Sequence, residues 1–264
     1  MPADRSLRAE RAIARVMLIE LFRRKDLYVL GLLVLVFLGA AASIDFFGVG
    51  GAEVYLRELS TTLTLLFTVI IAVGVVARQI PRELERKTLM PILAKPLSRW
   101  QFVFGKFLGA VASFTAALAV LWACSALVSA LKGVRLTGLL VQGFVLQWLG
   151  LVMLTAFALM VSTVVSETAV SVTLSLLAYF LLKGFTSNIH ILGSGASGVG
   201  ASALALVYTV VPHFEFYDPT QMMAFAPLQH WLRPLDWLFF AGYAFGYAAI
   251  FLAGAWLAFR RRRI

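Results

Sequence analysis

Ionisable side chains gather in one internal stretch of the sequence, residues 80–106, and their order favours contact between proteins rather than bond-making chemistry. Acidic and basic members alternate directly after Pro81: Arg82, Glu83, Glu85 and Arg86. Proline suits the first turn of a helix, and the helix dipole favours acidic side chains near that end. We therefore expect a short polar helix whose side chains form ion pairs and hydrogen bonds.

The remainder of the stretch is longer than a simple connection requires. Leu89 and Ile92 give it an apolar edge, and prolines punctuate it at Pro91 and Pro96. A turn between two helices needs only a few residues, whereas this one takes about 25. We expect it to dock onto a partner, with Leu89 and Ile92 filling a groove. The alternative is a solvated loop in which Trp100 is an ordinary interfacial anchor.

Sequence signals for catalysis, nucleotide binding and metal binding are absent or weak. There is no G-x-x-x-x-G-K-[ST] phosphate loop and no H-E-x-x-H zinc motif, and the G-x-G-x-x-G at residues 193–198 has no strand and helix around it. His190, His213 and His230 match no compact metal spacing, and Cys124 has no second cysteine to pair with. We expect no catalytic site, cofactor or metal in this chain.

The elements that position the charged stretch are membrane helices. The chain is 61% hydrophobic and 14% charged, far more apolar than soluble domains. Runs long enough to cross a bilayer as helices occupy residues 27–44, 59–77, 107–131, 139–165, 169–182 and 237–259. The apolar piece 201–211 stops at Pro212 and is too short to span, so it lies at the interface or re-enters. The expected fold is an all-α polytopic protein with six spans, a single transmembrane domain over 1–264.

Basic residues give this domain an orientation. Eighteen of the 23 Lys and Arg residues precede the first expected span, lie in 78–106 or end the chain. The positive-inside rule then places both termini and the 78–106 loop in the cytoplasm and 183–236 outside. Residues 1–26 are expected to form an amphipathic interfacial helix. The net charge of +10 is explained by membrane lipids with anionic headgroups, without a nucleic-acid partner.

The expected spans carry hydroxyls but no Asp, Glu, Lys, Arg or His. Proton- and ion-driven carriers usually keep an ionisable residue within the membrane, so the composition counts against that class. Thr61, Thr64 and Thr68 share one helical face of the second span. They either pack against a neighbouring helix, which is the favoured interpretation, or line a translocation path for an amphipathic substrate.

The charged stretch resembles the cytoplasmic loop of ABC-2 type permeases, the membrane subunits of ATP-binding-cassette transporters. The sequence IPRELERKTLMPILAKPLSRWQFVFGKFLG matches that family's pattern at Glu83, Thr88, Leu89, Lys95, Pro96, Ser98, Arg99, Gly105 and Lys106. Lys87 stands where the family commonly has glycine. The six-span layout with both termini inside is also similar to that family.

The resemblance implies a division of labour between chains. The loop would carry a coupling helix that docks onto a separate ABC ATPase, and two permease subunits would join two ATPases, which bind ATP and Mg²⁺. The implied coupling residues are Pro81, Arg82, Glu83, Glu85, Arg86, Thr88, Leu89 and Ile92. A second contact would come from Glu167, in the short turn between the fourth and fifth spans. Alternatively, Glu167 only caps the fifth helix.

Two further segments, ARVMLIELFRRKDLY (14–28) and VVPHFEFYDPTQ (210–221), are similar to the permease branch that includes nitrous-oxide-reductase maturation transporters. The expected function is a permease subunit of a bacterial inner membrane, with export the commoner mode in the family. The second permease is another copy or a paralogue, and an extracytoplasmic accessory protein is a further candidate partner. The alternative function is a non-transporting scaffold or mechanotransmitting subunit driven by an ABC ATPase.

Overall fold

A computed structural model describes residues 29, 32, 33, 35–37, 39, 40, 51–85, 98–131, 139–188, 206–220 and 232–261. Three expectations lie largely or wholly outside these residues: the interfacial helix 1–26, the first span 27–44, and the part of the charged stretch that holds Arg86, Thr88, Leu89 and Ile92. The few described positions between 29 and 40 are helical.

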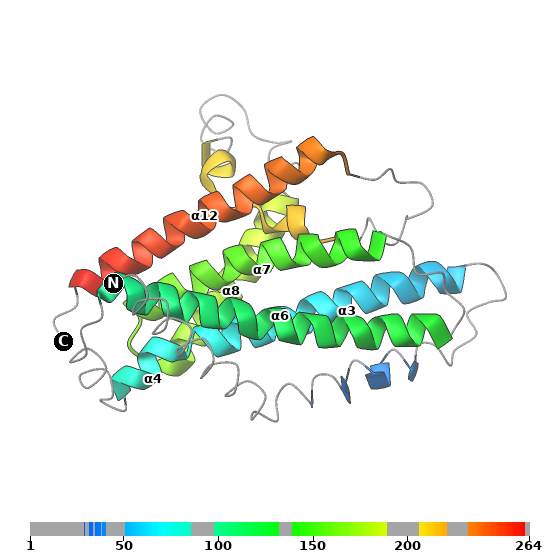
Figure 1. The fold of residues 1–264 in the computed structure, drawn as a ribbon, viewed down its shortest axis with the longest axis horizontal. Coiled ribbons are helices and arrows are strands. Elements are labelled where there is room, and N and C mark those ends of the chain that lie inside the picture. Colours follow the sequence, from blue (N-terminus) through cyan, green and yellow to red (C-terminus); the bar gives the residue numbers. More distant parts are fainter. Residues whose placement is uncertain are drawn as a thin grey trace, which may run out of the picture.

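The described chain is all helical and contains no strand (Figure 1). Its long helices are α3 (Gly51–Val76), α6 (Arg99–Leu131), α7 (Leu139–Val164), α8 (Thr168–Ser187) and α12 (Pro234–Arg261), joined by the short α4 (Gln79–Glu85) and the 3-10 turn η1 (Phe214–Tyr217). Five segments in the described part of the chain are long and apolar enough to cross a membrane. The expectation of an all-α membrane fold is therefore confirmed for these residues.

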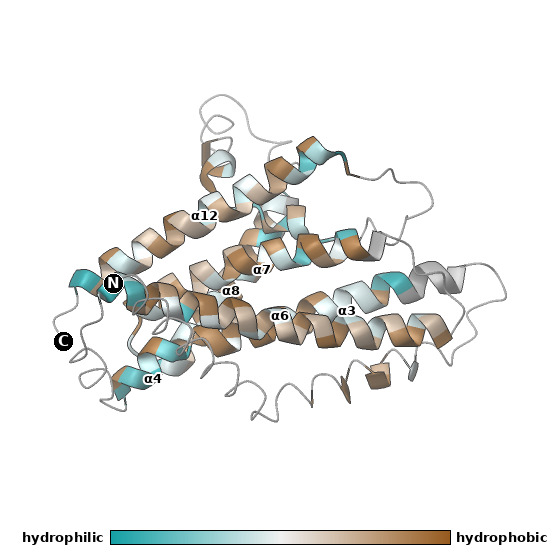
Figure 2. Cartoon of the chain, viewed as in Figure 1, coloured by the Kyte–Doolittle hydropathy of each residue, from teal (hydrophilic) through white to brown (hydrophobic). Residues whose placement is uncertain are grey.

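The bundle is built around α7. The most apolar window of α7 is 67% buried, whereas the corresponding windows of α8 and α12 are only 17% and 22% buried. The outward faces of α8 and α12 are nevertheless apolar, as at Leu181 and Phe239. Figure 2 shows apolar residues along the long helices and hydrophilic residues gathered near their ends. This pattern suits helices whose outer faces meet lipid or another membrane subunit.

Helix ends fall where capping groups lie, not where the apolar runs stop. α6 begins at Arg99, well before residue 107, the start of the apolar run. Its first turn is a capping box, in which the Ser98 backbone N–H donates to Gln101 Oε1 at 2.9 Å and the Gln101 N–H donates to Ser98 Oγ at 3.2 Å. α12 likewise starts at Pro234, and Asp236 accepts a hydrogen bond from the Arg233 N–H at 2.9 Å.

The part of the 206–220 segment around η1 packs against the bundle, whereas most of residues 206–210 are exposed. Residues 206–210 are helical, and Pro212 follows that helix. Phe214 and Tyr217 of η1 are each 2% exposed. Tyr217 sits so close to Gly150, near the midpoint of α7, that a Cβ on that glycine would lie 2.5 Å from the tyrosine Cβ. The apolar piece before Pro212 is different, since Leu206 and Val210 are 70% and 66% exposed, and whether it lies at the interface or re-enters stays a prediction.

We predict that Gly150→Ala lowers the free energy of unfolding by about 2 kcal/mol, because the new methyl group displaces the Tyr217 backbone and not only a flexible side-chain tip. Thermal unfolding in detergent measures the change. Gly246→Ala on α12 is the matched control, since a Cβ there meets nothing within 4 Å. Equal melting temperatures for the two variants would contradict the close packing of η1 on α7.

Candidate functional site

α4 lies at the end of the bundle where α6 and α8 begin and α12 ends, here called the α4 end (Figure 1). A two-residue turn separates it from α3. Its apolar side faces the bundle, since Ile80 and Pro81 are buried and Leu84 packs against the core. Glu85 is exposed. Residues 79–85 therefore form a short helix, as the sequence predicts, and this helix is seated on α7 and α8, which the sequence did not predict.

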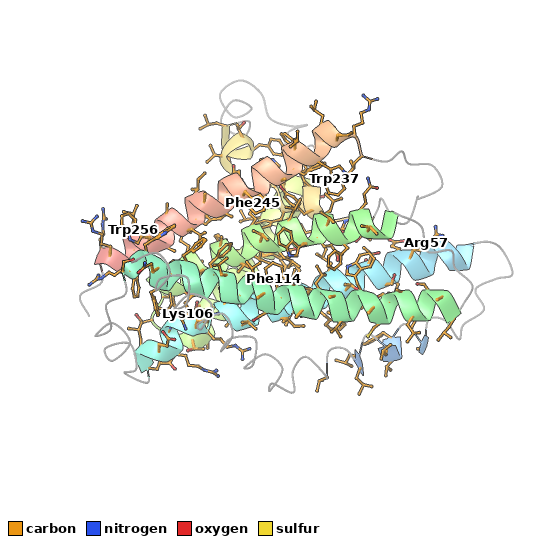
Figure 3. The ribbon with its side chains drawn as sticks, viewed as in Figure 1. Arg57, Lys106, Phe114, Trp237, Phe245 and Trp256 are labelled. Atoms are coloured by element: carbon orange, nitrogen blue, oxygen red, sulfur yellow. The ribbon has the colours of Figure 1, made fainter. Side chains whose placement is uncertain are left out.

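Glu83, predicted as a partner contact, is paired within the chain. Its carboxylate forms an ion pair with Lys106 on α6, and the two side chains are 18% and 12% exposed. The Lys106 ammonium also lies 5.5 Å from the centre of the Phe102 ring. Figure 3 labels Lys106 at this end of the bundle. The pair fixes α4 against the first turns of α6, where little water reaches it.

Glu85 makes a second link, from α4 to α8. Its carboxylate accepts hydrogen bonds from the Thr168 backbone N–H at 3.2 Å and from Thr168 Oγ1 at 2.7 Å. Thr168 is the first residue of α8, where backbone N–H groups lack helical partners and negative charge is favoured. Glu167 occupies the N-cap position but makes no side-chain cap hydrogen bond. Glu167 therefore provides no capping hydrogen bond, and Glu85 supplies the capping oxygen.

A third link joins α6 to α12. Arg99 Nη1 donates to the backbone oxygens of Phe259 at 3.2 Å and Arg260 at 2.8 Å, at the end of α12. A basic side chain at a helix C-terminus satisfies carbonyls that have no partner within the helix. The rings of Phe102 and Phe259 stack beside this contact with centroids 5.4 Å apart. The α4 end is thus held together by side chains that cap or neutralise groups on other helices.

These links contain no arrangement for bond-making. Across the described residues no three His, Cys, Asp or Glu side chains come together as a metal site would require. What the arrangement can do is mechanical: a force on α4 reaches α6 through Glu83 and α8 through Glu85.

A family model for the ABC-2 family transporter protein matches residues 12–263, nearly the whole chain. The chain belongs to the ABC-2 transporter family. Comparison with the curated proteins finds no significant match. The resemblance seen in the charged stretch is confirmed at the level of the family. As an ABC-2 protein with several apolar helices, the chain is a multi-pass membrane component of a transporter, a class of subunit that is generally not catalytic.

The threonine face of this ABC-2 protein is buried between helices. Thr61, Thr64 and Thr68 are at most 2% exposed. Thr64 Oγ1 lies 3.0 Å from Ser125 Oγ on α6, and Thr68 Oγ1 donates to the Thr64 carbonyl at 2.6 Å. These contacts favour the packing interpretation, and a translocation path along this face stays a prediction.

Sequence analysis missed the polar centre beside that face. Gln147 on α7 accepts a hydrogen bond from Trp122 Nε1 at 2.8 Å and donates to the Thr61 carbonyl at 3.2 Å. It thereby ties α3, α6 and α7 together inside the membrane part of the ABC-2 fold. The available signal was a glutamine within an otherwise apolar run, where an amide without partners would be costly.

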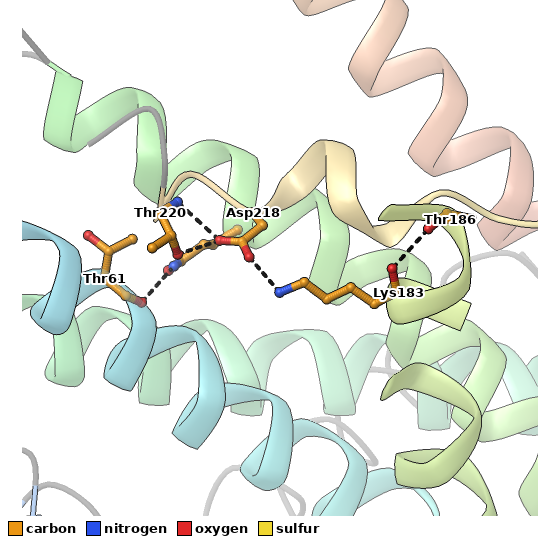
Figure 4. Close-up of polar contacts among 6 residues, drawn as sticks. Thr61, Lys183, Thr186, Asp218 and Thr220 are labelled. Carbon is orange, nitrogen blue, oxygen red and sulfur yellow. Dashed lines mark hydrogen bonds and ion pairs between the residues drawn. The ribbon is translucent and has the colours of Figure 1, made fainter. Parts of the chain in front are cut away.

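Away from the α4 end, an ion pair holds the 206–220 segment of the ABC-2 chain to α8. Lys183 Nζ lies 2.5 Å from Asp218 Oδ2, and Thr220 N–H donates to Asp218 Oδ1 at 3.0 Å (Figure 4). Burial alone would raise the pKa of Asp218, but Lys183 and Thr220 bring it below its ordinary value. The carboxylate is therefore ionised at neutral pH and the pair is intact.

His213 is buried among aromatic rings in the same segment. It is 5% exposed, its Nδ1 lies 2.7 Å from Tyr243 Oη, and its ring stacks on Phe216 with centroids 5.0 Å apart. Burial lowers the pKa of His213, and the nearby Glu215 carboxylate offsets this only in part. The imidazole is therefore neutral at pH 7. His190 and His230 lie outside the described residues.

We predict that acidification destabilises the fold through His213. A base whose pKa is lower in the folded chain binds more protons when the chain is unfolded. Its contribution to the free energy of unfolding is therefore complete above its ordinary pKa of about 6.5 and is lost as the pH falls below that value. The slope is at most about 1.4 kcal/mol per pH unit. Melting temperatures measured between about pH 5 and 7.5 should decline in the wild type and decline less in His213→Gln. Superimposable curves for the two chains would contradict the role of His213 in this pH dependence.

Asp218 does not interfere in this pH range. Because its pKa is depressed, it loses its stabilising charge only at lower pH.

Proposed function

We propose that this chain is the permease subunit of an ABC transporter and that α4 is its coupling helix. A pair of such subunits, two copies or a copy and a paralogue, would join two ATPase subunits that bind ATP and Mg²⁺. The α4 end would face the cytoplasm of a bacterial cell and the 206–220 segment would belong to the opposite side. Export is the proposed direction.

The observation that carries the proposal is the seating of α4 within an ABC-2 fold. Its carboxylates hold the starts of α6 and α8, so a protein that moves α4 also moves two membrane helices. The sequence contains no phosphate-loop motif, which supports an energy source in a separate ATPase subunit. Similarity to the nitrous-oxide-reductase maturation branch rests on two short segments and stays a prediction.

Two of the described residues are proposed to contact the ATPase. Arg82 is half-buried on α4, and Glu167 is exposed in the turn before α8. They would act with Arg86, Thr88, Leu89 and Ile92 of the following stretch. Glu83 and Pro81 would not touch the ATPase but would hold α4 in place, because Glu83 is paired with Lys106 and Pro81 is buried. Closure of the ATPases would push α4 and tilt α3 and α6, which alternates access to a path at the subunit interface.

Purification from the native membrane in mild detergent, followed by mass spectrometry of the co-purifying chains, tests the proposal. We expect an ABC ATPase in equal copy number with this chain, and an accessory protein would identify the outer partner. A chain that is recovered without any nucleotide-binding partner would overturn the proposal. An ATPase partner in a complex that moves no substrate would favour the non-transporting scaffold.

A further inference from the structure

α8 is the least buried of the described membrane helices and is fastened near both ends by side chains of other elements. Its first residue, Thr168, donates its backbone N–H and its hydroxyl to the Glu85 carboxylate on α4. Its Lys183, one turn before the last residue, is paired with Asp218 in the 206–220 segment. Since only 17% of its apolar window is buried within this chain, few packing contacts with the chain's other helices oppose a shift.

Glu83 and Glu85 of α4 act on different helices because of their spacing. Residues two apart on an α-helix point about 200° away from each other. The structure shows the result: Glu83 reaches Lys106 on α6, and Glu85 reaches Thr168 on α8. Loss of one carboxylate therefore releases one helix and leaves the other attached.

The cap is also a directional contact. Glu85 accepts from both the backbone N–H and the hydroxyl of Thr168, so the start of α8 keeps its position relative to α4 only while the carboxylate is in place. Glu167 offers no substitute, because its side chain makes no cap hydrogen bond. A displacement of α4 must then either carry α8 with it or break these bonds.

We propose that α8 carries the movement of α4 to the 206–220 segment, with Glu85 as the positioning residue at one end and the Lys183–Asp218 pair at the other. The inference rests on the proposed function, in which an ATPase moves α4. It adds that the signal to the 206–220 segment travels through α8, separately from the route through Lys106 to α6. Because that segment packs against α7 at Gly150, a pull on Asp218 changes how η1 sits in the bundle.

The test uses single reporter cysteines in a Cys124→Ser chain, since Cys124 is the single native cysteine. An environment-sensitive fluorophore is attached at Leu108 on α6, at Val170 on α8 or at Leu206 in the 206–220 segment, which are 36%, 46% and 70% exposed. The transporter, reconstituted with its ATPase, is then given a non-hydrolysable ATP analogue. In the wild type we expect a signal change at all three positions.

Glu85→Ala should reduce the response at residues 170 and 206 by about fivefold or more and leave the response at residue 108. Lys183→Met should remove the response at 206 alone. If Glu85 served only to touch the ATPase, its replacement would weaken all three responses together, which would overturn the inference. An unchanged response at residue 206 in both variants would overturn it as well.

A second variant covers the case in which Glu85→Ala does not fold. Glu85→Cys with Thr168→Cys, joined by a short bifunctional thiol reagent, replaces the cap by a covalent link, and in this chain the reporter at residue 206 is an incorporated fluorescent amino acid instead of a labelled cysteine. The joined chain should respond at residue 206 and the same chain without the reagent should not; the reverse result would contradict the inference. A wild-type transporter without any nucleotide response would instead count against the proposed function itself, so the two failures are distinguishable.

Discussion

Lys106→Met is expected to lower the free energy of unfolding by about 3 kcal/mol, because it removes the cation that lies against the largely buried Glu83 carboxylate. The apolar methionine side chain fits where the lysine stem runs past Phe102, so lost charge and not lost volume dominates. Chemical unfolding in detergent, followed by tryptophan fluorescence, measures the change.

The control for this prediction is the double variant Glu83→Leu with Lys106→Met. Replacing both members of a buried ion pair by apolar groups is often nearly neutral, so most of the lost stability should return. A double variant that is less stable than Lys106→Met would show that Glu83 contributes through other contacts and that the ion pair is not what holds α4 to α6.

Arg86→Ala combined with Leu89→Asp is expected to lower transport-coupled ATP hydrolysis by about tenfold or more, because it removes a charge and places another in the apolar edge predicted to fill a groove on the ATPase. The variant should still insert into the membrane and keep its melting temperature. Hydrolysis is measured in the reconstituted complex with its own ATPase.

Glu58→Gln is the matched control for that variant. Glu58 is an exposed acidic residue of α3, far along that helix from α4, so its replacement removes a charge away from the proposed contact. Its coupled hydrolysis should equal the wild type. Normal coupling in the Arg86 and Leu89 variant would remove the stretch after α4 from the ATPase contact.

The membrane helices were predictable because apolar length is a strong signal. The runs from 59, 107, 139, 169 and 237 all correspond to described helices. The ends of these helices were not predictable, because a helix end depends on single capping groups. The Ser98–Gln101 box places the start of α6 at Arg99, and its S-x-x-Q spacing was present in the sequence but weak beside the hydropathy of the following run.

The charged residues of the candidate site were also predicted, but their partners within the chain were not. Glu85 and Thr168 are 83 positions apart, and Arg99 lies 161 positions from Arg260. Charge patterning in one sequence has a range of a few residues, as in helical pairs three or four apart. It identified Glu83 and Glu85 as contact residues and could not show that both bind other helices of the same chain.

The central claim is that α4 of this ABC-2 protein docks onto an ABC ATPase. Photo-crosslinking in native membranes tests it most directly, with a photoreactive residue in place of Arg82 on α4 and, separately, in place of the exposed Leu235 at the start of α12. The account predicts an adduct with an ABC ATPase from position 82 and none from position 235. No ATPase adduct from position 82, or one from position 235, would contradict it.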